Sequence, residues 1–216
     1  MRQISRTLWT IGLLALASLL AWNLLLSRGA QALQAIPPAS TATSAALSLN
    51  QNISFVSQPR LSPAFLNQVL AAYHSPAAGL GQQIYDLGRH YDINSDLLLA
   101  IFGHESLFGT TGEARVSRSI GNLRCLDSSY APYHPGCSDG YAQFPTWLDG
   151  VGASDRLLRV GYVDGAVTIP ITGHRCTTLA QVIPVWAPAA DGNNPGAYIR
   201  DVLAFLQTWY SGEVKP

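Results

Sequence analysis

The sequence predicts a mostly helical α+β domain that follows an apolar N-terminal segment and a short tether. Three features lead to this prediction: an uncharged apolar run near the N-terminus, repeated helix-start signals after residue 61, and a segment at 109–145 rich in Gly, Ser, Pro and Asp. The 216 residues are enough for one ordinary domain with an appendage and too few for two full domains.

Charged residues make up 12% of the chain, about half the usual share, and apolar residues make up 48%. This composition excludes a disordered acidic or basic protein. The 13 basic residues balance the 13 acidic ones, so no overall basic field favours a nucleic acid as partner. No Asp or Glu precedes Asp86, so the N-terminal part carries only positive charges.

Residues 8–26 form an apolar run without a charged side chain. At about 1.5 Å per residue, a helix of this length approaches the roughly 30 Å hydrocarbon core of a membrane. The small-residue tripeptide Ala30-Gln31-Ala32 also fits a signal-peptide cleavage site. Residues 1–32 are therefore expected to be either a signal anchor, which leaves the domain outside the cytoplasm on a single-pass cell-membrane segment, or a cleaved signal peptide, which leads to secretion.

Residues 33–60 are rich in Ala, Ser, Thr, Gln and Pro, and Arg60 is their only charged residue. Such a stretch lacks the periodicity that would bury a core, so we expect a flexible tether. The globular domain is then residues 61–216, which we expect to act as a monomer.

Helix-start signals divide this domain into segments. Ser62-Pro63 and Asn194-Pro195 each place a capping residue before a proline at the first helical position. Asn94 or Ser95 is expected to cap a third helix, and Pro184 to shorten a fifth. The predicted helices cover residues 63–73, 79–91, 96–106, 146–160, 177–185 and 195 onward. Residues 109–145 lack apolar periodicity and predict a loop or a small β-lobe.

Cys125 and Cys137 lie in this irregular segment, where a disulfide would stabilise the fold by about 2–3 kcal/mol outside the cytoplasm. Cys176 would then be left over, although its pairing with either of the others is also open. The five histidines are scattered without a pair at ligand spacing, so we expect neither a metal site nor a cofactor.

Glu105 is one of only three glutamates, with Glu113 and Glu213. It follows Leu98 by seven positions and Ile101 by four, so it shares their apolar face at the end of the predicted helix. Desolvation on such a face favours the protonated form of a carboxyl group. A general acid needs that proton to protonate a departing glycosidic oxygen. The alternative is a structural glutamate held by backbone groups or by an arginine.

Four segments extend this interpretation. They are HESLFGT at 104–110, SIGNL at 119–123, GYAQFPTW at 140–147 and WAPAADGNNPGAY at 186–198. Together they resemble the bacterial glucosaminidase family of peptidoglycan hydrolases, a lysozyme-like group. That family has a helix-ending Glu followed by Ser and Gly, an Asn-containing turn, a Tyr-x-x-Phe-x-Ser/Thr motif that opens a helix, and a Tyr-Ala-x-x-x-x-Tyr element. The last segment looks like an expanded version of this element, and the resemblance covers roughly residues 77–210.

The resemblance implies a lysozyme-like fold and endo-β-N-acetylglucosaminidase-type hydrolysis of the glycan strands of peptidoglycan, with Glu105 as the catalytic acid. It also implies that substrate is bound at or near the motif positions, for which Asn122, Tyr141, Trp186 and Tyr198 are the candidates. Flat aromatic rings pack against the apolar faces of sugar rings, and an asparagine can shape the floor of a cleft by hydrogen bonding.

The chain departs from the family at the second carboxylate. The family often has another Glu roughly thirty-odd residues after the first, and here Asp139 is the nearest substitute. Asp139 would position the attacking water, or it is simply the turn residue of Ser138-Asp139-Gly140. Without a second carboxylate, the substrate's own acetamido group can attack, and a lytic transglycosylase is also open. A non-catalytic glycan-binding or scaffold protein is the rival outside the enzyme class.

Overall fold

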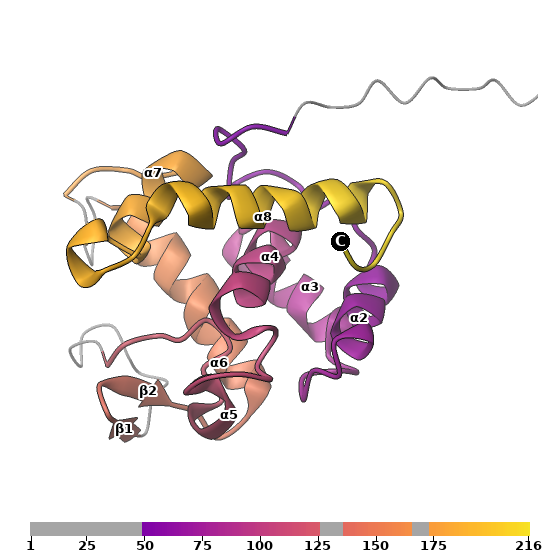
Figure 1. Ribbon diagram of the computed structural model, residues 1–216, viewed down its shortest axis with the longest axis horizontal. Coiled ribbons are helices and arrows are strands. Elements are labelled where there is room, and N and C mark those ends of the chain that lie inside the picture. Colours follow the sequence, from indigo (N-terminus) through magenta and orange to yellow (C-terminus); the bar gives the residue numbers. More distant parts are fainter. Residues whose placement is uncertain (1–48, 126–135, 166–172) are drawn as a thin grey trace, which may run out of the picture. The chain divides into compact units, whose positions relative to one another are not determined.

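Helix α4 (Ser95–Ser106) lies at the centre of the structure, and nearly all of its residues are buried. The computed structural model describes residues 49–125, 136–165 and 173–216, which belong to one compact unit (Figure 1). Helix α8 (Pro195–Tyr210) packs along α4, and α3 (Gly81–Tyr91) contacts α4 from another side. The core is therefore built around a helix without a solvent-exposed face, as its continuous apolar sequence requires.

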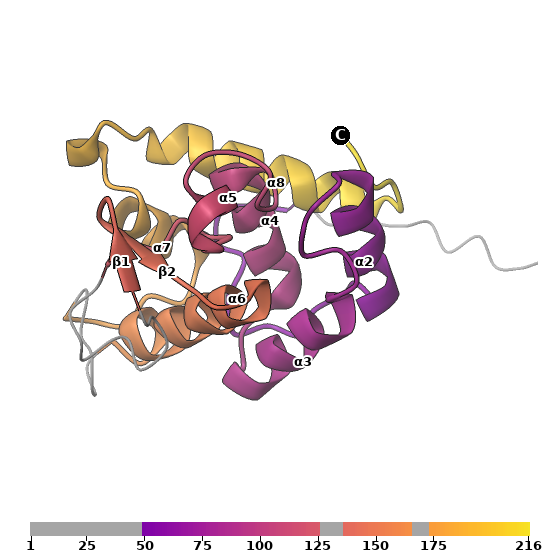
Figure 2. The ribbon, with the colours of Figure 1, turned by 90° about the horizontal axis from the view of Figure 1, so that it is seen from below.

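The remaining helices complete a mostly helical domain, as the sequence predicts. Figure 2 shows α2 and α3 at one end of the unit and the β-strands at the other. Helix α2 packs on α3, and α3 packs on α6. The bounds are α2 (Pro63–Ala72), α5 (Ala114–Ser117), α6 (Trp147–Arg156) and α7 (Leu179–Trp186), with a π-helical turn η1 (Leu157–Val163) and a 3₁₀ turn η2 (Ala189–Asp191).

Side-chain caps fix the helix starts where the sequence predicts them. The side chain of Ser62 accepts from the Phe65 N–H, that of Asn94 from two N–H groups of α4, and that of Asn194 from the Ala197 N–H. Thr146 forms a reciprocal capping box at the start of α6. Each cap pairs backbone N–H groups that the helix itself leaves unbonded.

Two helix ends differ from the prediction. The α-helix from Thr146 ends at Arg156, and residues 157–163 continue it as the wider turn η1, which a period of 3.6 residues does not reveal. Helix α7 passes through Pro184 and ends at Trp186, one residue beyond the predicted end at residue 185. Both differences bring side chains to the pocket described below, namely Tyr162 and Trp186.

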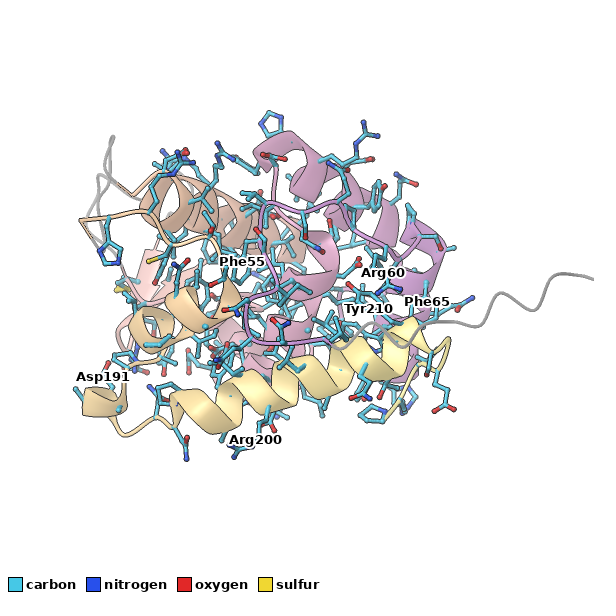
Figure 3. All side chains as sticks on the ribbon, turned by 90° about the horizontal axis from the view of Figure 1, so that it is seen from above. Phe55, Arg60, Phe65, Asp191, Arg200 and Tyr210 are labelled. Atoms are coloured by element: carbon cyan, nitrogen blue, oxygen red, sulfur yellow. A yellow bond between two sulfur atoms is a disulfide. The ribbon has the colours of Figure 1, made fainter. Side chains whose placement is uncertain are left out.

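The domain begins earlier than predicted, and residues 49–60 are not a tether. Phe55 is fully buried; its N–H donates to the Thr177 carbonyl at 2.7 Å, and its carbonyl accepts from the Asn94 N–H at 2.7 Å. The guanidinium carbon of Arg60 lies 4.0 Å from the centroid of the Tyr210 ring, and Figure 3 labels Phe55, Arg60 and Tyr210. Composition alone cannot predict that this segment belongs to the domain, because the residues that it contacts are distant in sequence.

A buried carboxylate, Asp96, joins the first and last parts of this unit. One of its oxygens, Oδ2, accepts hydrogen bonds from the N–H of Arg60 at 2.7 Å, from the N–H of Leu61 at 3.2 Å and from the Tyr210 hydroxyl at 3.0 Å. Burial raises the pKa of Asp96, and these hydrogen bonds oppose that rise. Burial and then the adjacent carboxylate raise the pKa of Tyr210, so its hydroxyl keeps the proton that it donates.

The irregular segment forms a small lobe with a β-hairpin. Strand β1 (Gly136–Ser138) pairs antiparallel with β2 (Tyr141–Gln143). A disulfide links Cys125 to Cys137, which is one of the pairings that the sequence left open. Cys176 is buried and free.

The predicted membrane segment at 8–26 lies outside the described residues. In the described ranges, no helix is long and apolar enough to span a membrane.

Asp155 on α6 is a buried carboxyl group without a hydrogen-bond partner among the described residues. Its side chain is fully buried, and neither carboxyl oxygen has a hydrogen-bond partner within the described part of the chain. Burial raises the pKa of Asp155 well above its ordinary value. The folded protein therefore holds a proton on Asp155 at pH values where the unfolded chain has released it.

Asp155→Asn tests this reading. Between the unfolded-state pKa, about 3.9, and the raised folded-state pKa, wild-type stability falls as pH rises, by up to about 1.4 kcal/mol per pH unit from this group. The variant lacks the titration, so its free energy of unfolding relative to wild type should increase from pH 4 to pH 8 in urea denaturation. The exposed Asp86→Asn serves as control, and parallel curves for Asp155→Asn and wild type would contradict the assignment.

The disulfide is expected to stabilise the lobe rather than the helices. Cys125→Ser/Cys137→Ser should lower the free energy of unfolding by about 2–3 kcal/mol. Amide hydrogen exchange should accelerate in β1 and β2 and remain slow in α4 and α8. Cys176→Ala leaves the link intact and controls for thiol removal, and unchanged exchange in the hairpin of the double variant would refute the prediction.

Candidate active site

Glu105 lies one residue before the end of α4, with its half-buried side chain at a pocket of about 560 Å³. The pocket walls come from four places: the turn at 121–124, strand β2, the turn η1, and the end of α7 with the loop that follows it. Its lining residues are Glu105, Gly121, Asn122, Leu123, Arg124, Tyr141, Leu157, Tyr162, Val185, Trp186, Ala187, Pro188, Asp191 and Asn193.

Three uncharged side chains donate hydrogen bonds to the Glu105 carboxyl group. Oε1 accepts from the Tyr198 hydroxyl at 2.7 Å and from the Trp186 indole Nε1 at 2.8 Å. Oε2 accepts one long bond, from Asn122 Nδ2 at 3.4 Å. No Lys, Arg or His of the described ranges forms an ion pair with Glu105. Glu105 is therefore not a structural glutamate held by an arginine of the described residues.

The two carboxyl oxygens consequently differ in the hydrogen bonds that they accept. Oε1 accepts two short bonds, which occupy both lone pairs and fix the orientation of the carboxyl group. Among the described residues, Oε2 has only the long contact to Asn122, so it is the oxygen that remains available to a bound ligand. A carboxyl group with one fixed oxygen and one available oxygen suits general acid chemistry.

The turn after Glu105 is strained and tightly packed. Leu107, Phe108 and Gly109 all have positive φ, at 47°, 58° and 85°, which is unfavourable for the first two side chains. Phe108 is fully buried and contacts the ring of Tyr73 at a centroid distance of 4.6 Å. A Cβ at Gly109 would lie 2.6 Å from the ring of Trp147, so glycine is required there. Packing thus holds a turn that would otherwise relax and move the end of α4.

Ser106 connects this turn to the next motif. Its hydroxyl donates to the Ile120 carbonyl at 2.6 Å and accepts from the Gly109 N–H at 2.7 Å. Asn122, at a φ of 48°, then donates through Nδ2 to the main-chain carbonyl of Glu105 at 2.6 Å. The two polar residues therefore fix the Asn-containing turn against the end of α4. The sequence pattern indicated no structural role for Ser106, although its place directly after Glu105 was the available signal.

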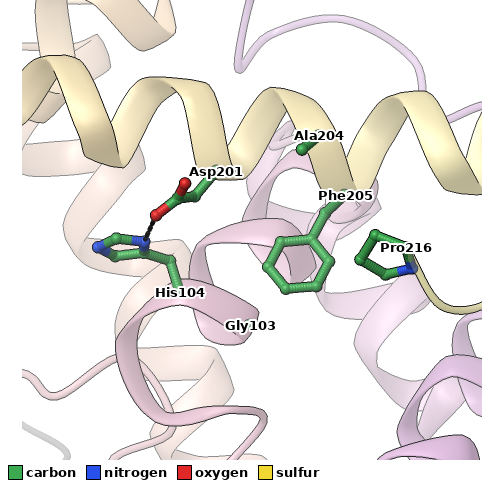
Figure 4. Close-up of a pocket in the computed structure, with 6 residues that line it drawn as sticks. All are labelled: Gly103, His104, Asp201, Ala204, Phe205 and Pro216. Atoms are coloured by element: carbon green, nitrogen blue, oxygen red, sulfur yellow. Dashed lines mark ion pairs between the residues drawn. The ribbon is translucent and has the colours of Figure 1, made fainter.

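Tyr198 supports Glu105 from the first turn of α8. Burial, and then the charge of and hydrogen bond to Glu105, raise the pKa of Tyr198 well above its ordinary value, so the hydroxyl stays protonated and donates. The ring of His104 lies 3.8 Å from that of Tyr198, centroid to centroid, and His104 Nδ1 lies 3.1 Å from Asp201 Oδ2. Figure 4 shows this pair between α4 and α8, where both residues line a second pocket together with Gly103, Ala204, Phe205 and Pro216.

Of the predicted site residues, Glu105, Asn122, Tyr141 and Trp186 line the pocket, whereas Tyr198 is buried and does not line it, so it contacts Glu105 and not the open pocket. Asn122, Trp186 and Tyr198 bind Glu105 directly, and Tyr141 lines the same pocket without contacting the carboxyl group through a hydrogen bond.

Asp139 is not among these residues. It is exposed at the tip of the β1–β2 hairpin, with φ of 49° followed by 81° at Gly140, and it does not line the pocket. Consecutive positive φ values are typical of a two-residue hairpin turn, so the geometry supports the turn interpretation of Asp139.

The carboxylate that lines the pocket with Glu105 is instead Asp191, at the end of η2. Figure 3 labels it at the short 3₁₀ turn that precedes α8. Asp191, Arg124 and Tyr162 were not predicted to lie in the site. The expanded segment at 186–198 was the available signal for Asp191, and its length alone does not show that the loop turns toward the pocket.

No group of His, Cys, Asp or Glu in the described residues has the arrangement of a metal site. In the comparisons with known proteins, no family model and no curated protein matches this chain.

The Glu105 contacts predict a specific spectroscopic change. In Glu105→Ala, the Trp186 indole N–H loses its acceptor, so its resonance should shift upfield and exchange faster with water in a ¹⁵N-correlated NMR spectrum. The Trp209 indole N–H, which donates to the Val214 carbonyl at 3.1 Å, is the internal control and should not change. Trp186→Phe assigns the resonance. An unshifted Trp186 signal would mean that the two side chains are not bonded in solution.

Proposed function

We propose that the protein is an exported peptidoglycan hydrolase of the endo-β-N-acetylglucosaminidase type, with a lysozyme-like domain and Glu105 as general acid. The observation that carries the proposal is the environment of Glu105. A half-buried carboxyl group lies in a pocket, receives hydrogen bonds from three uncharged side chains and has no cationic partner among the described residues. The sequence resemblance supplies the substrate class.

In this proposal, Glu105 Oε2 transfers its proton to the glycosidic oxygen as the bond to the anomeric carbon breaks. Trp186 and Tyr198 hold Oε1 throughout, so the carboxyl group does not rotate away during the transfer. The two donors also stabilise the carboxylate that remains after the proton has left. The ring of Tyr141 offers an apolar face on which a pyranose ring can stack.

The second catalytic group is either Asp191 or the substrate's acetamido group. Asp191 lines the pocket and can position the attacking water, whereas the exposed turn residue Asp139 does not line it. Attack by the acetamido oxygen needs no second carboxylate. If the attacking group is instead the sugar's own 6-hydroxyl, the product is an anhydro-sugar and the enzyme is a lytic transglycosylase.

A non-catalytic glycan-binding or scaffold protein is the rival proposal. The strained turn at Leu107 and Phe108 favours the enzyme, because strain of this kind persists at functional sites when packing enforces it. The predicted N-terminal anchor or signal would deliver the domain to the cell envelope, where its substrate is.

Glu105→Gln tests the mechanism. The amide keeps the size of the side chain and removes the proton that assists departure, and general acid–base assistance is worth about 10²–10⁴ in rate. Release of soluble fragments from purified peptidoglycan should therefore fall at least about 100-fold, with an unchanged melting temperature. Glu113→Gln is the matched control. Glu113 is the residue directly before α5, and the variant should retain full activity. Wild-type-like release by Glu105→Gln would overturn the mechanism.

Asp191→Asn and Asp139→Asn identify the second group in the same assay. A large loss with Asp191→Asn alone supports water positioning by Asp191. Full activity of both variants supports attack by the acetamido group, and a large loss with Asp139→Asn alone would contradict the pocket geometry.

A further inference from the structure

Arg124 is the one basic side chain among the described residues that line the Glu105 pocket. It follows the Asn122 turn and directly precedes the disulfide residue Cys125. The side chain is exposed, so it is reachable by a ligand that enters the pocket.

The backbone around Arg124 is held on both sides. Arg124 forms an antiparallel bridge with Tyr141; the Cys125 N–H donates to the Gly140 carbonyl at 2.9 Å, and the Ala142 N–H donates to the Leu123 carbonyl at 2.9 Å. The disulfide at Cys125 adds a covalent restraint at the next residue. The position from which the guanidinium group extends is therefore fixed relative to β2.

The guanidinium group lies against a ring that also lines the pocket. Its carbon is 4.3 Å from the centroid of the Tyr141 ring. Stacking of this kind orders the side chain and leaves the N–H donors at the edge of the guanidinium plane free to bind a ligand. No carboxylate in the described ranges forms an ion pair with Arg124.

We propose that Arg124 makes the pocket selective for an anionic glycan, by binding a carboxylate carried on or next to the sugar whose bond Glu105 protonates. The planar guanidinium group matches a carboxylate with two parallel hydrogen bonds, whereas neutral sugar hydroxyl groups offer no such pair. This inference rests on the proposed function. In peptidoglycan, the carboxylate has two sources: the lactyl group of a muramic sugar without a peptide, or the peptide stem.

The experiment compares three glycans with the full-length protein. The first is peptide-free glycan with free lactyl carboxylates, the second is the same glycan with those carboxylates converted to neutral methylamides, and the third is peptide-bearing glycan. The specificity constant kcat/KM is measured for wild type, Arg124→Gln and Arg124→Lys. The Trp186 indole resonance verifies that the Glu105 pocket is intact in each variant.

Wild type should cleave the carboxylate form about tenfold faster than the methylamide form, as expected for a charge-assisted hydrogen-bonded pair. Arg124→Gln should reduce that ratio to about one, mainly by slowing cleavage of the charged form, and Arg124→Lys should retain part of the preference. If only peptide-bearing glycan shows the Arg124-dependent preference, the stem is the source of the carboxylate. Equal rates in wild type on all three glycans would overturn the inference while leaving the proposed function intact. A preference for the carboxylate form or for the peptide-bearing glycan that Arg124→Gln leaves unchanged would do the same.

If wild type cleaves none of the three glycans, the proposed function fails and calorimetric binding of the same glycans decides the inference separately. An Arg124-dependent preference for the carboxylate form in binding supports it. Equal binding, or no binding, overturns it.

Discussion

Two tyrosine hydroxyl groups of α8 bind carboxyl groups at opposite ends of α4, and both the core and the site depend on this pairing. Tyr198, in the first turn of α8, donates to Glu105 at the end of α4, and Tyr210, at the end of α8, donates to Asp96 at its start. The helices therefore run antiparallel with their register defined at both ends. Because α4 is buried almost throughout, its two carboxyl groups must find donors inside the protein, and α8 provides one for each.

This arrangement gives the two carboxyl groups of a single helix different surroundings. Asp96 receives three hydrogen bonds on one oxygen and connects residues 60–61 with the C-terminal helix, so its role is to hold the fold together. Glu105 receives its short bonds on Oε1 only, which leaves Oε2 at the pocket. A tyrosine hydroxyl thus binds a carboxyl group at each end of α4. The carboxyl group of Asp96 is enclosed in the fold, whereas that of Glu105 is held in place with one oxygen at the pocket.

Local signals in the sequence predicted many of the helix starts. The caps at Ser62, Asn94, Thr146 and Asn194 depend on residues within three positions of one another, so they are visible in the sequence and present in the structure. The disulfide was expected because its two cysteines lie in a segment with little apolar periodicity.

The contacts that escaped prediction are long-range. The pairing of residue 55 with 94 and 177 made a predicted tether part of the domain, and the loop before α8 brought Asp191 rather than Asp139 to the pocket. The spacing of residues in the sequence cannot distinguish a residue at the hairpin tip from one at the pocket, because it contains no information on the direction in which a loop turns. Likewise, the stacking of Arg124 on Tyr141 follows from a single β-bridge that no sequence period reveals.

The most direct test of a glycosidase centred on Glu105 is mass spectrometry of the fragments that the full-length protein releases from purified peptidoglycan. The proposed activity predicts soluble fragments that end in a reducing N-acetylglucosamine. Fragments ending in reducing N-acetylmuramic acid would contradict the proposed bond, and anhydro-muramic ends would identify a lytic transglycosylase. A complete absence of fragments, from protein shown to be folded, would contradict the account of Glu105 as a catalytic acid.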